Sequence, residues 1–171
     1  PALSPRARHH RAPPRDDAMT RRLRPVDAVD LSGLARLHAK CFPDDRWDAA
    51  ALAELLAMRG ASGHLVEETG DGQPLGLILD LIVAEHAEIL TLGVAPAARR
   101  SGIARAMLDD LFRRARLAGA HSVGLEAAAD NVAARRLYEA CGFSQTGHRP
   151  GYYRRPGATV DALVFRRTLL G

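Results

Sequence analysis

Hydrophobic and polar positions follow helical and strand periods in turn along most of the chain. Apolar residues at helical spacing predict four helices, at Ala28 to Lys40, Ala49 to Met58, Ile103 to Ala118 and Val132 to Ala140. In the third helix one apolar stripe is formed by Ile103, Met107, Leu108, Leu111, Ala115 and Ala118. Asp48 is a predicted N-cap, and Gly60, Gly119 and Gly142 follow predicted helix ends.

Strand patterns fill the intervals between these helices. They cover Thr20 to Leu23, His64 to Glu68, Leu75 to Val83, Glu88 to Val94, Ser122 to Glu126, Phe143 to Tyr153 and Ala158 to Leu169. Asp71-Gly72 is typical of a hairpin turn, whereas the helix after Val94 implies a crossover and hence one parallel pair. The pattern therefore predicts an α/β fold with a mixed, mainly antiparallel central sheet of about six or seven strands flanked by about four helices.

Length and composition narrow the class of protein. The chain has 171 residues, enough for one domain with its own core. The longest apolar run, Pro74 to Ala84, is broken by Gly76 and Asp80, so no segment reaches the length of about 18 residues that a membrane helix needs. Residues 1–18 are rich in proline and charge, and we expect a disordered extension there, followed by one domain over residues 19–171 with Met19 as the natural start.

Charge and cysteine usage exclude further classes. The net charge is only +4, which gives a nucleic-acid partner no support beyond the arginine content. Lys40 is the only lysine beside 23 arginines, which is typical of a GC-rich coding bias and not of a surface built to bind phosphates. The two cysteines, Cys41 and Cys141, form no Cys-x-x-Cys pair, and the seven histidines have no ligand spacing. We therefore expect a cytoplasmic protein without a metal.

The first candidate for chemistry is the segment Arg99-Arg100-Ser101-Gly102-Ile103-Ala104, between a strand and a long helix. Small residues there let a ligand approach the backbone, and the first N–H groups of a helix form a site for phosphate or pyrophosphate. Arg99, Arg100 and Arg105 add positive charge. Taken alone, this segment is explained equally well as a turn in which Gly102 adopts the required backbone conformation and the arginines are solvated.

The second candidate is a carboxylate and a phenol on successive elements. Glu126 ends an apolar strand, and Tyr138 follows twelve residues later, with Asn131 at the helix start between them. A carboxylate at the end of a strand can act as a general base, and a tyrosine hydroxyl can donate a proton. Each has a simpler interpretation: an exposed strand end for Glu126, a helix cap for Asn131 and a core side chain for Tyr138.

Together these motifs resemble the GNAT superfamily of acetyl-CoA-dependent N-acetyltransferases. Arg-x-x-Gly-x-Ala opens a helix at Arg99, Glu126 follows on a strand, and Asn-x-x-Ala-x-x-Leu-Tyr-Glu-x-x-Gly-Phe runs from Asn131 to Phe143. The match covers about residues 20 to 169 in element order and is sharpest from Leu90 to Phe143. The resemblance implies the GNAT fold and acetyl-CoA as co-substrate.

Within the superfamily the chain most resembles the RimI type, which acetylates the N-terminal alanine of a small-subunit ribosomal protein. Cys41-Phe42-Pro43 with Trp47-Asp48 resembles the Phe-Pro-Trp-Ser motif of that type, interrupted by Asp44, Asp45 and Arg46. Gly151-Tyr152-Tyr153 and Asp161-Ala162 resemble its ending, with Gly151 in place of Asn and Arg154 in place of Pro. As neighbours on a strand the two tyrosines should point to opposite faces, one to the peptide cleft and the other to the core.

The resemblance implies direct attack of an amine on the thioester in a ternary complex. Glu126 would be the general base and Tyr138 the general acid that protonates the departing thiolate, with a backbone N–H near Val94 on the oxyanion. The acetyl and pantetheine portion of acetyl-CoA would contact Leu92, Gly93, Val94 and Asn131. The pyrophosphate would contact Arg100, Ser101, Gly102, Ile103, Ala104 and Arg105.

Alternatives remain open at this stage. Ala87-Glu88-Ile89 resembles the context of the catalytic glutamate in histone-type GNAT enzymes, so Glu88 is a second candidate base with a lysine side chain as acceptor. The acceptor could also be a small-molecule amine. A non-catalytic acetyl-CoA-binding module is a further alternative, although binding alone would need neither Glu126 nor Tyr138.

Overall fold

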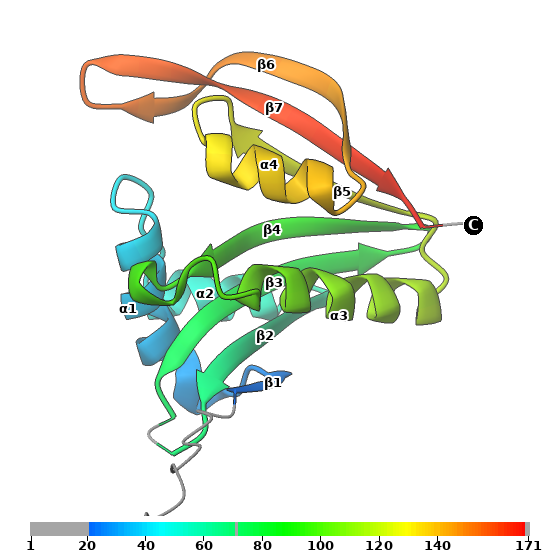
Figure 1. Ribbon diagram of the computed structural model, residues 1–171. Coiled ribbons are helices and arrows are strands. Elements are labelled where there is room, and N and C mark those ends of the chain that lie inside the picture. Colours follow the sequence, from blue (N-terminus) through cyan, green and yellow to red (C-terminus); the bar gives the residue numbers. More distant parts are fainter. Residues whose placement is uncertain (1–20, 71, 170–171) are drawn as a thin grey trace, which may run out of the picture.

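One mixed sheet of seven strands organises residues 21–70 and 72–169, the part of the chain that the computed structural model describes (Figure 1). The strand order is β1-β2-β3-β4-β5-β7-β6. Neighbours are antiparallel except β4 and β5, which confirms the parallel pair predicted from the crossover. The strands are β1 (Arg21–Pro25), β2 (Ala61–Glu68), β3 (Pro74–Val83), β4 (His86–Val94), β5 (Ser122–Ala128), β6 (Ser144–Arg155) and β7 (Ala158–Thr168).

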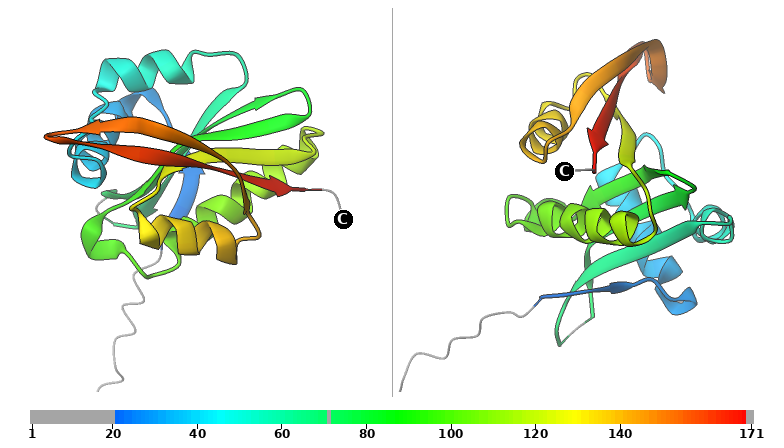
Figure 2. Two further views of the ribbon diagram at one scale, coloured as in Figure 1. Left: turned by 90° about the horizontal axis from the view of Figure 1, so that it is seen from above. Right: turned by 90° about the vertical axis from the view of Figure 1, so that its right-hand side faces the viewer.

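Four α-helices cover the two faces of this sheet, as Figure 2 shows in its right-hand view. They are α1 (Leu31–Cys41), α2 (Ala49–Leu56), α3 (Ile103–Leu117) and α4 (Val132–Ala140), with 3-10 turns η1 (Ala28–Asp30) and η2 (Pro96–Ala98). Leucines of α1 and α2 pack on β2 and β3 in one core cluster. The apolar stripes of α3 and α4 pack in a larger cluster on the opposite face. The GNAT fold predicted from the sequence is therefore confirmed.

Two close contacts fix α3 on the sheet. Gly76 of β3 lies under the helix, where an added Cβ would be 2.7 Å from the side chain of Ile103. Asp80 of β3 is fully buried and forms an ion pair with Arg114 of α3 at 2.7 Å, and it also accepts a hydrogen bond from Ser62. Removing one member of such a buried pair is costly, because the other charge is left without a partner.

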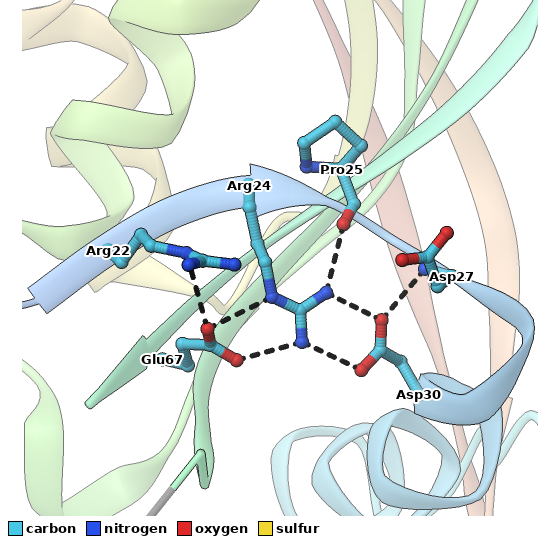
Figure 3. Close-up of polar contacts among 6 residues, drawn as sticks. All are labelled: Arg22, Arg24, Pro25, Asp27, Asp30 and Glu67. Atoms are coloured by element: carbon cyan, nitrogen blue, oxygen red, sulfur yellow. Dashed lines mark hydrogen bonds and ion pairs between the residues drawn. The ribbon is translucent and has the colours of Figure 1, made fainter. Parts of the chain in front are cut away.

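A second cluster of charges fixes β1 and the turn before α1 (Figure 3). The Arg24 guanidinium donates to Glu67 of β2 and to Asp30 of η1, at 2.7 to 3.0 Å, and also to the carbonyl of Pro25. These hydrogen bonds hold the pKa of the Asp30 and Glu67 carboxyls below their usual range. The N-terminal edge strand is thus anchored to β2 by side chains as well as by the backbone ladder.

The strands β4 and β5 separate soon after they meet. Their parallel pairing runs from His86 to Glu88 on β4, opposite Ser122 to Gly124 on β5, while both strands continue further. Opposite β3, the register shifts at Leu90, because Asp80 pairs with Ile89 and Leu79 pairs with Thr91. Such a bulge bends the strand that carries it. The sheet therefore opens at its centre, between the C-terminal parts of β4 and β5 (Figure 1).

Several element bounds differ from the sequence-based expectations. The predicted helix at Ala28 to Lys40 is divided into η1 and α1, because the Asp30 carboxylate accepts hydrogen bonds from the backbone of Asp27 and from Arg24. Val29, whose position in the sequence predicts a place on the apolar face of that helix, is 89% exposed. The first strand is Arg21–Pro25, and β5 extends past Glu126 to Ala128.

The remaining expectations concern the ends of the chain and the membrane. Residues 1–18, predicted to be a disordered extension, lie outside the described residues, as does Met19. None of the helices in residues 21–70 and 72–169 is long and apolar enough to cross a membrane. Both cysteines are free thiols.

Candidate active site

A cavity of about 280 Å³ lies where β4 and β5 separate. One side is formed by β4 and the loop between α1 and α2, and the other by β5, α4 and the end of β6. The residues lining it are His38, Cys41, Phe42, Pro43, Asp44, Asp45, Trp47, Ile89, Leu90, Thr91, Leu92, Leu125, Glu126, Ala127, Ala128, Asn131, Ala134, Tyr138, Tyr153, Arg154 and Arg155. Segments far apart in the sequence thus share one hollow at the opening of the sheet.

Glu126 lies on β5 and lines this cavity. It is two residues before the end of the strand, opposite Val164 of β7. Its side chain is 21% exposed, and its Oε1 atom forms an ion pair with Nε of Arg149 on β6 at 2.9 Å. A partly buried carboxylate on the wall of a cavity can accept a proton from a bound molecule.

Tyr138 of α4 lines the same cavity from the other side of β5. Its ring packs against Phe143 and Phe165, with centroid separations of 5.6 and 6.2 Å, and its exposed fraction is 7%. Burial raises the pKa of the phenol above its usual range. A phenol is protonated at neutral pH even at its ordinary pKa of about 10, so the hydroxyl has a proton to donate. The core interpretation of Tyr138 is correct, because its ring packs in the core. The side chain also lines the cavity, so its role as a proton donor stays a prediction.

The start of α3 forms a second candidate region, beyond the end of β4. Gly102 precedes the helix with φ +82°, and no side chain in the described residues caps the first turn. A Cβ built at Gly102 would have no neighbour within 4 Å, so the backbone amides there are approachable. Arg100, Ser101, Gly102 and Arg105 are exposed, whereas the Ile103 side chain is buried. This arrangement suits phosphate groups, and these residues lie outside the lining of the cavity.

Of the predicted contacts on β4 and at the start of α4, Leu92 and Asn131 line the cavity, and Gly93 and Val94 do not. Leu92 lines it, whereas Gly93 is buried against Cys41 and Phe42. The carbonyl of Val94 accepts from Sγ of Cys41 at 3.4 Å and from Nε of Arg99 at 3.2 Å. Asn131 lines the cavity, and its Oδ1 accepts from the backbone of Ala134. The cap interpretation of Asn131 is therefore correct, and it leaves the side-chain NH₂ for another partner.

Glu88, the alternative base, lies on the paired part of β4 opposite Gly124. It is exposed and does not line the cavity.

The two adjacent tyrosines of β6, Tyr152 and Tyr153, differ from expectation. Tyr153 lines the cavity, but Tyr152 is 51% exposed and not in the core. Their rings are in edge contact at 5.1 Å instead of facing apart, because the pairing of β6 with β7 is irregular between Arg149 and Tyr153.

Sequence reasoning missed how the α1–α2 loop is fixed to β4. His38 stacks on Trp47 at 4.7 Å and accepts from its backbone N–H at Nδ1, while Nε2 is 3.3 Å from Oγ1 of Thr91. Burial lowers the pKa of His38, so the ring is neutral at pH 7 and Nε2–H donates to Thr91. The sequence has no local signal for this contact, because Thr91 is far from His38 along the chain.

The groups around the cavity and at the start of α3 determine which reactions this region can support. A carboxylate and a protonated phenol share one cavity, and an anion-binding helix start lies beyond it. Among residues 21–70 and 72–169, no three His, Cys, Asp or Glu side chains gather as metal ligands. The arrangement suits proton transfer during attack on a substrate that carries phosphate groups.

Comparisons with known proteins agree with this description. Residues 31–143 match the model of the Acetyltransferase (GNAT) family. The N-alpha-acetyltransferase RimI of Mycobacterium tuberculosis is 36% identical over 144 residues, covering 81% of this chain and 87% of that protein.

Solved structures share the fold. The ribosomal-protein-S18-alanine N-acetyltransferase from Escherichia coli has a TM-score of 0.80 at 21% identity, covering 88% of this chain and 94% of that one. Arabidopsis thaliana NAA60 in complex with acetyl-CoA has a TM-score of 0.78 at 21% identity, covering 87% and 98%. At these identities the likeness concerns the fold.

Proposed function

The chain belongs to the GNAT family and is an acetyl-CoA-dependent N-acetyltransferase, and from this premise we propose that its acceptor is the N-terminal amine of a protein. The N-terminal alanine of a small-subunit ribosomal protein is the most specific form of this proposal. It is supported by the similarity to the M. tuberculosis RimI protein and by the fold of the E. coli alanine N-acetyltransferase.

Glu126 and Tyr138 have complementary roles in this proposal. A peptide α-amine has a pKa of about 7.7–8.0, so a large part of it is protonated at neutral pH and must lose a proton before it can attack. Glu126 takes that proton, directly or through a water molecule, and Tyr138 gives its own to the sulfur when the C–N bond forms and the C–S bond breaks. The observation that carries the assignment is that both side chains line one cavity where the sheet opens.

Acetyl-CoA supplies the activated acetyl group. Most of its proposed binding residues lie at the end of β4 and at the start of α3. The backbone of Leu92, Gly93 and Val94 and the side chain of Asn131 contact the acetyl and pantetheine portion. The pyrophosphate binds at the backbone amides from Gly102 to Arg105, with Arg100 and Ser101 beside it. The open space at Gly102 and the uncapped first turn of α3 support this part of the proposal.

The test compares two peptides that differ in their amines. The first begins with a free alanine and has no lysine, and the second has a blocked N-terminus and one internal lysine. We expect release of free thiol and a mass gain of one acetyl group with the first peptide only. Acetylation of the lysine peptide alone would favour a lysine acceptor, and acetyl-CoA binding without turnover on a broad amine panel would favour a non-catalytic module.

The same assay distinguishes the two candidate bases. Glu126→Gln should lower kcat for the alanine peptide by about 10²-fold or more at neutral pH. The loss should shrink above about pH 8, where the amine is already neutral. Glu88→Gln is the matched control, because Glu88 is an exposed strand residue outside the cavity. A larger loss in Glu88→Gln would move the base to β4.

A further inference from the structure

The ion pair between Glu126 and Arg149 connects two strands that are not neighbours in the sheet. Glu126 lies on β5 and Arg149 on β6, with β7 between them. In the register of the sheet, Glu126 is opposite Val164, and Val164 is opposite Gly147. Arg149 is two residues further along β6, so its guanidinium extends diagonally across β7 to place Nε 2.9 Å from Oε1 of Glu126.

The backbone around Arg149 is held by its own contacts. Asp161 of β7 accepts from the backbone N–H of Gly151 and lies 2.8 Å from Nε2 of His148, so both sides of Arg149 are bonded to one carboxylate. The hydrogen bond from His148 holds the pKa of Asp161 below its usual range. The Arg149 guanidinium also lies 5.7 Å from the ring centre of Tyr152. This surrounding structure fixes the point from which the arginine reaches Glu126.

The pair is poorly explained by stability alone. Arg149 is 58% exposed and Glu126 is 21% exposed, and ion pairs at such positions contribute little to folding. The pair does have a geometric effect on the carboxylate. Oε1 is the oxygen paired with Arg149, whereas no residue that the structure describes donates a hydrogen bond to Oε2. One oxygen is therefore fixed and the other is left for a bound molecule.

We propose that Arg149 is a positioning residue that holds the Glu126 carboxylate by Oε1 and leaves Oε2 for the acceptor amine. This inference rests on the proposed function, in which Glu126 accepts the proton of that amine. Arg149 contacts Glu126 and acts on the reaction only through it. Positioning a reacting group is a substantial part of catalysis, because a misplaced base must be reoriented in every turnover.

The experiment compares Arg149→Met, Arg149→Lys and Arg113→Met with the wild-type enzyme on the alanine peptide. Arg113 is a matched control: it is 62% exposed and pairs with a 14% exposed carboxylate, Asp110, on α3. We expect Arg149→Met to lower kcat about tenfold or more while KM for acetyl-CoA stays within twofold. Arg149→Lys should recover part of kcat, because an ammonium can also hold Oε1, and Arg113→Met should leave kcat unchanged.

A double variant separates this inference from the proposed function. If Arg149 acts through Glu126, then Arg149→Met should cause no further loss in a Glu126→Gln background. Equal losses in both backgrounds, or an Arg149→Met enzyme as active as Arg113→Met, would overturn the positioning role while leaving Glu126 as the base. Full activity of Glu126→Gln would instead overturn the proposed function. Thermal unfolding of each variant identifies any that fails to fold, and Arg149→Lys then carries the test.

Discussion

At the scale of single residues, Tyr138 combines two demands on one side chain. Its ring packs against Phe143 and Phe165, and the same side chain lines the cavity opposite the diverging end of β4. The phenol is protonated at neutral pH even at its ordinary pKa of about 10, and burial raises that pKa further. A group that must donate a proton to a departing thiolate benefits from being protonated before the reaction begins.

Tyr138→Phe should therefore affect turnover and not folding. The ring and its aromatic contacts remain, so we expect the melting temperature to change little. Without the hydroxyl, kcat should fall by about 10²-fold, the usual scale of general acid catalysis. Steady-state kinetics with the alanine peptide measure this, and Tyr152→Phe serves as control because Tyr152 is half exposed and does not line the cavity. A Tyr138→Phe enzyme with wild-type kcat would remove Tyr138 from the role of acid.

At the scale of elements, the start and end of α3 offer a matched pair of glycines. Gly102 before the helix has φ +82° and Gly119 after it has φ +84°, and neither has a neighbour within 4 Å of an added Cβ. Alanine at either position is strained by about 1–2 kcal/mol, because a left-handed backbone brings Cβ too close to the next carbonyl oxygen. Gly102 is the N-cap of α3 and Gly119 follows its C-cap, and a ligand is proposed to bind at the first only.

Gly102→Ala should thus raise KM for acetyl-CoA by about tenfold or more, since a methyl group would stand where the pyrophosphate approaches the amides. Gly102→Ala and Gly119→Ala should lower the melting temperature by similar amounts, but Gly119→Ala should leave KM for acetyl-CoA unchanged. Thermal unfolding and acetyl-CoA titration of both variants provide the comparison. If both leave KM unchanged, the start of α3 does not bind the phosphates.

The helices were the most predictable elements, because apolar periodicity and local caps define them. Both α3 and α4 begin at the predicted residue, and Asp48 caps α2 as expected. Glu126 and Tyr138, predicted from a local motif that resembles that of the RimI type, both line the cavity, and their catalytic roles stay predictions. The bulge at Leu90 and the irregular pairing near Tyr152 could not be predicted, because register depends on the strand across the sheet. The partners Arg149 and Thr91 were missed for the same reason.

At the scale of the whole molecule, the buried His38 and the half-buried His64 couple stability to pH. Burial lowers the pKa of both His38 and His64, and Arg114 lowers that of His64 further. His64 faces Asp80 and Asp110 as well, which oppose the shift, and its Nδ1 is buried without a partner among the described residues. In the unfolded chain both rings have the ordinary value of about 6.5.

The sign of this coupling follows from proton binding. Below about pH 6.5 the unfolded chain binds more protons than the folded protein, so the free energy of unfolding should fall as pH is lowered. Each histidine can contribute up to about 1.4 kcal/mol per pH unit. Urea unfolding between pH 7.5 and 5.5 should show this decline, with a smaller slope in His64→Asn. An unchanged slope in that variant would mean that His64 is protonated equally in both states.

Because β4 and β5 separate, part of β4 has no neighbouring strand at the centre of the sheet. Three residue pairs join the two parts of the sheet, and beyond Glu88 the inner edge of β4 faces the cavity instead of a neighbour. An extended molecule with amide groups can hydrogen-bond to such an edge as a missing strand would. In the proposed binding mode the co-substrate occupies this edge of β4 in place of a strand, and the edge is free again when the product leaves.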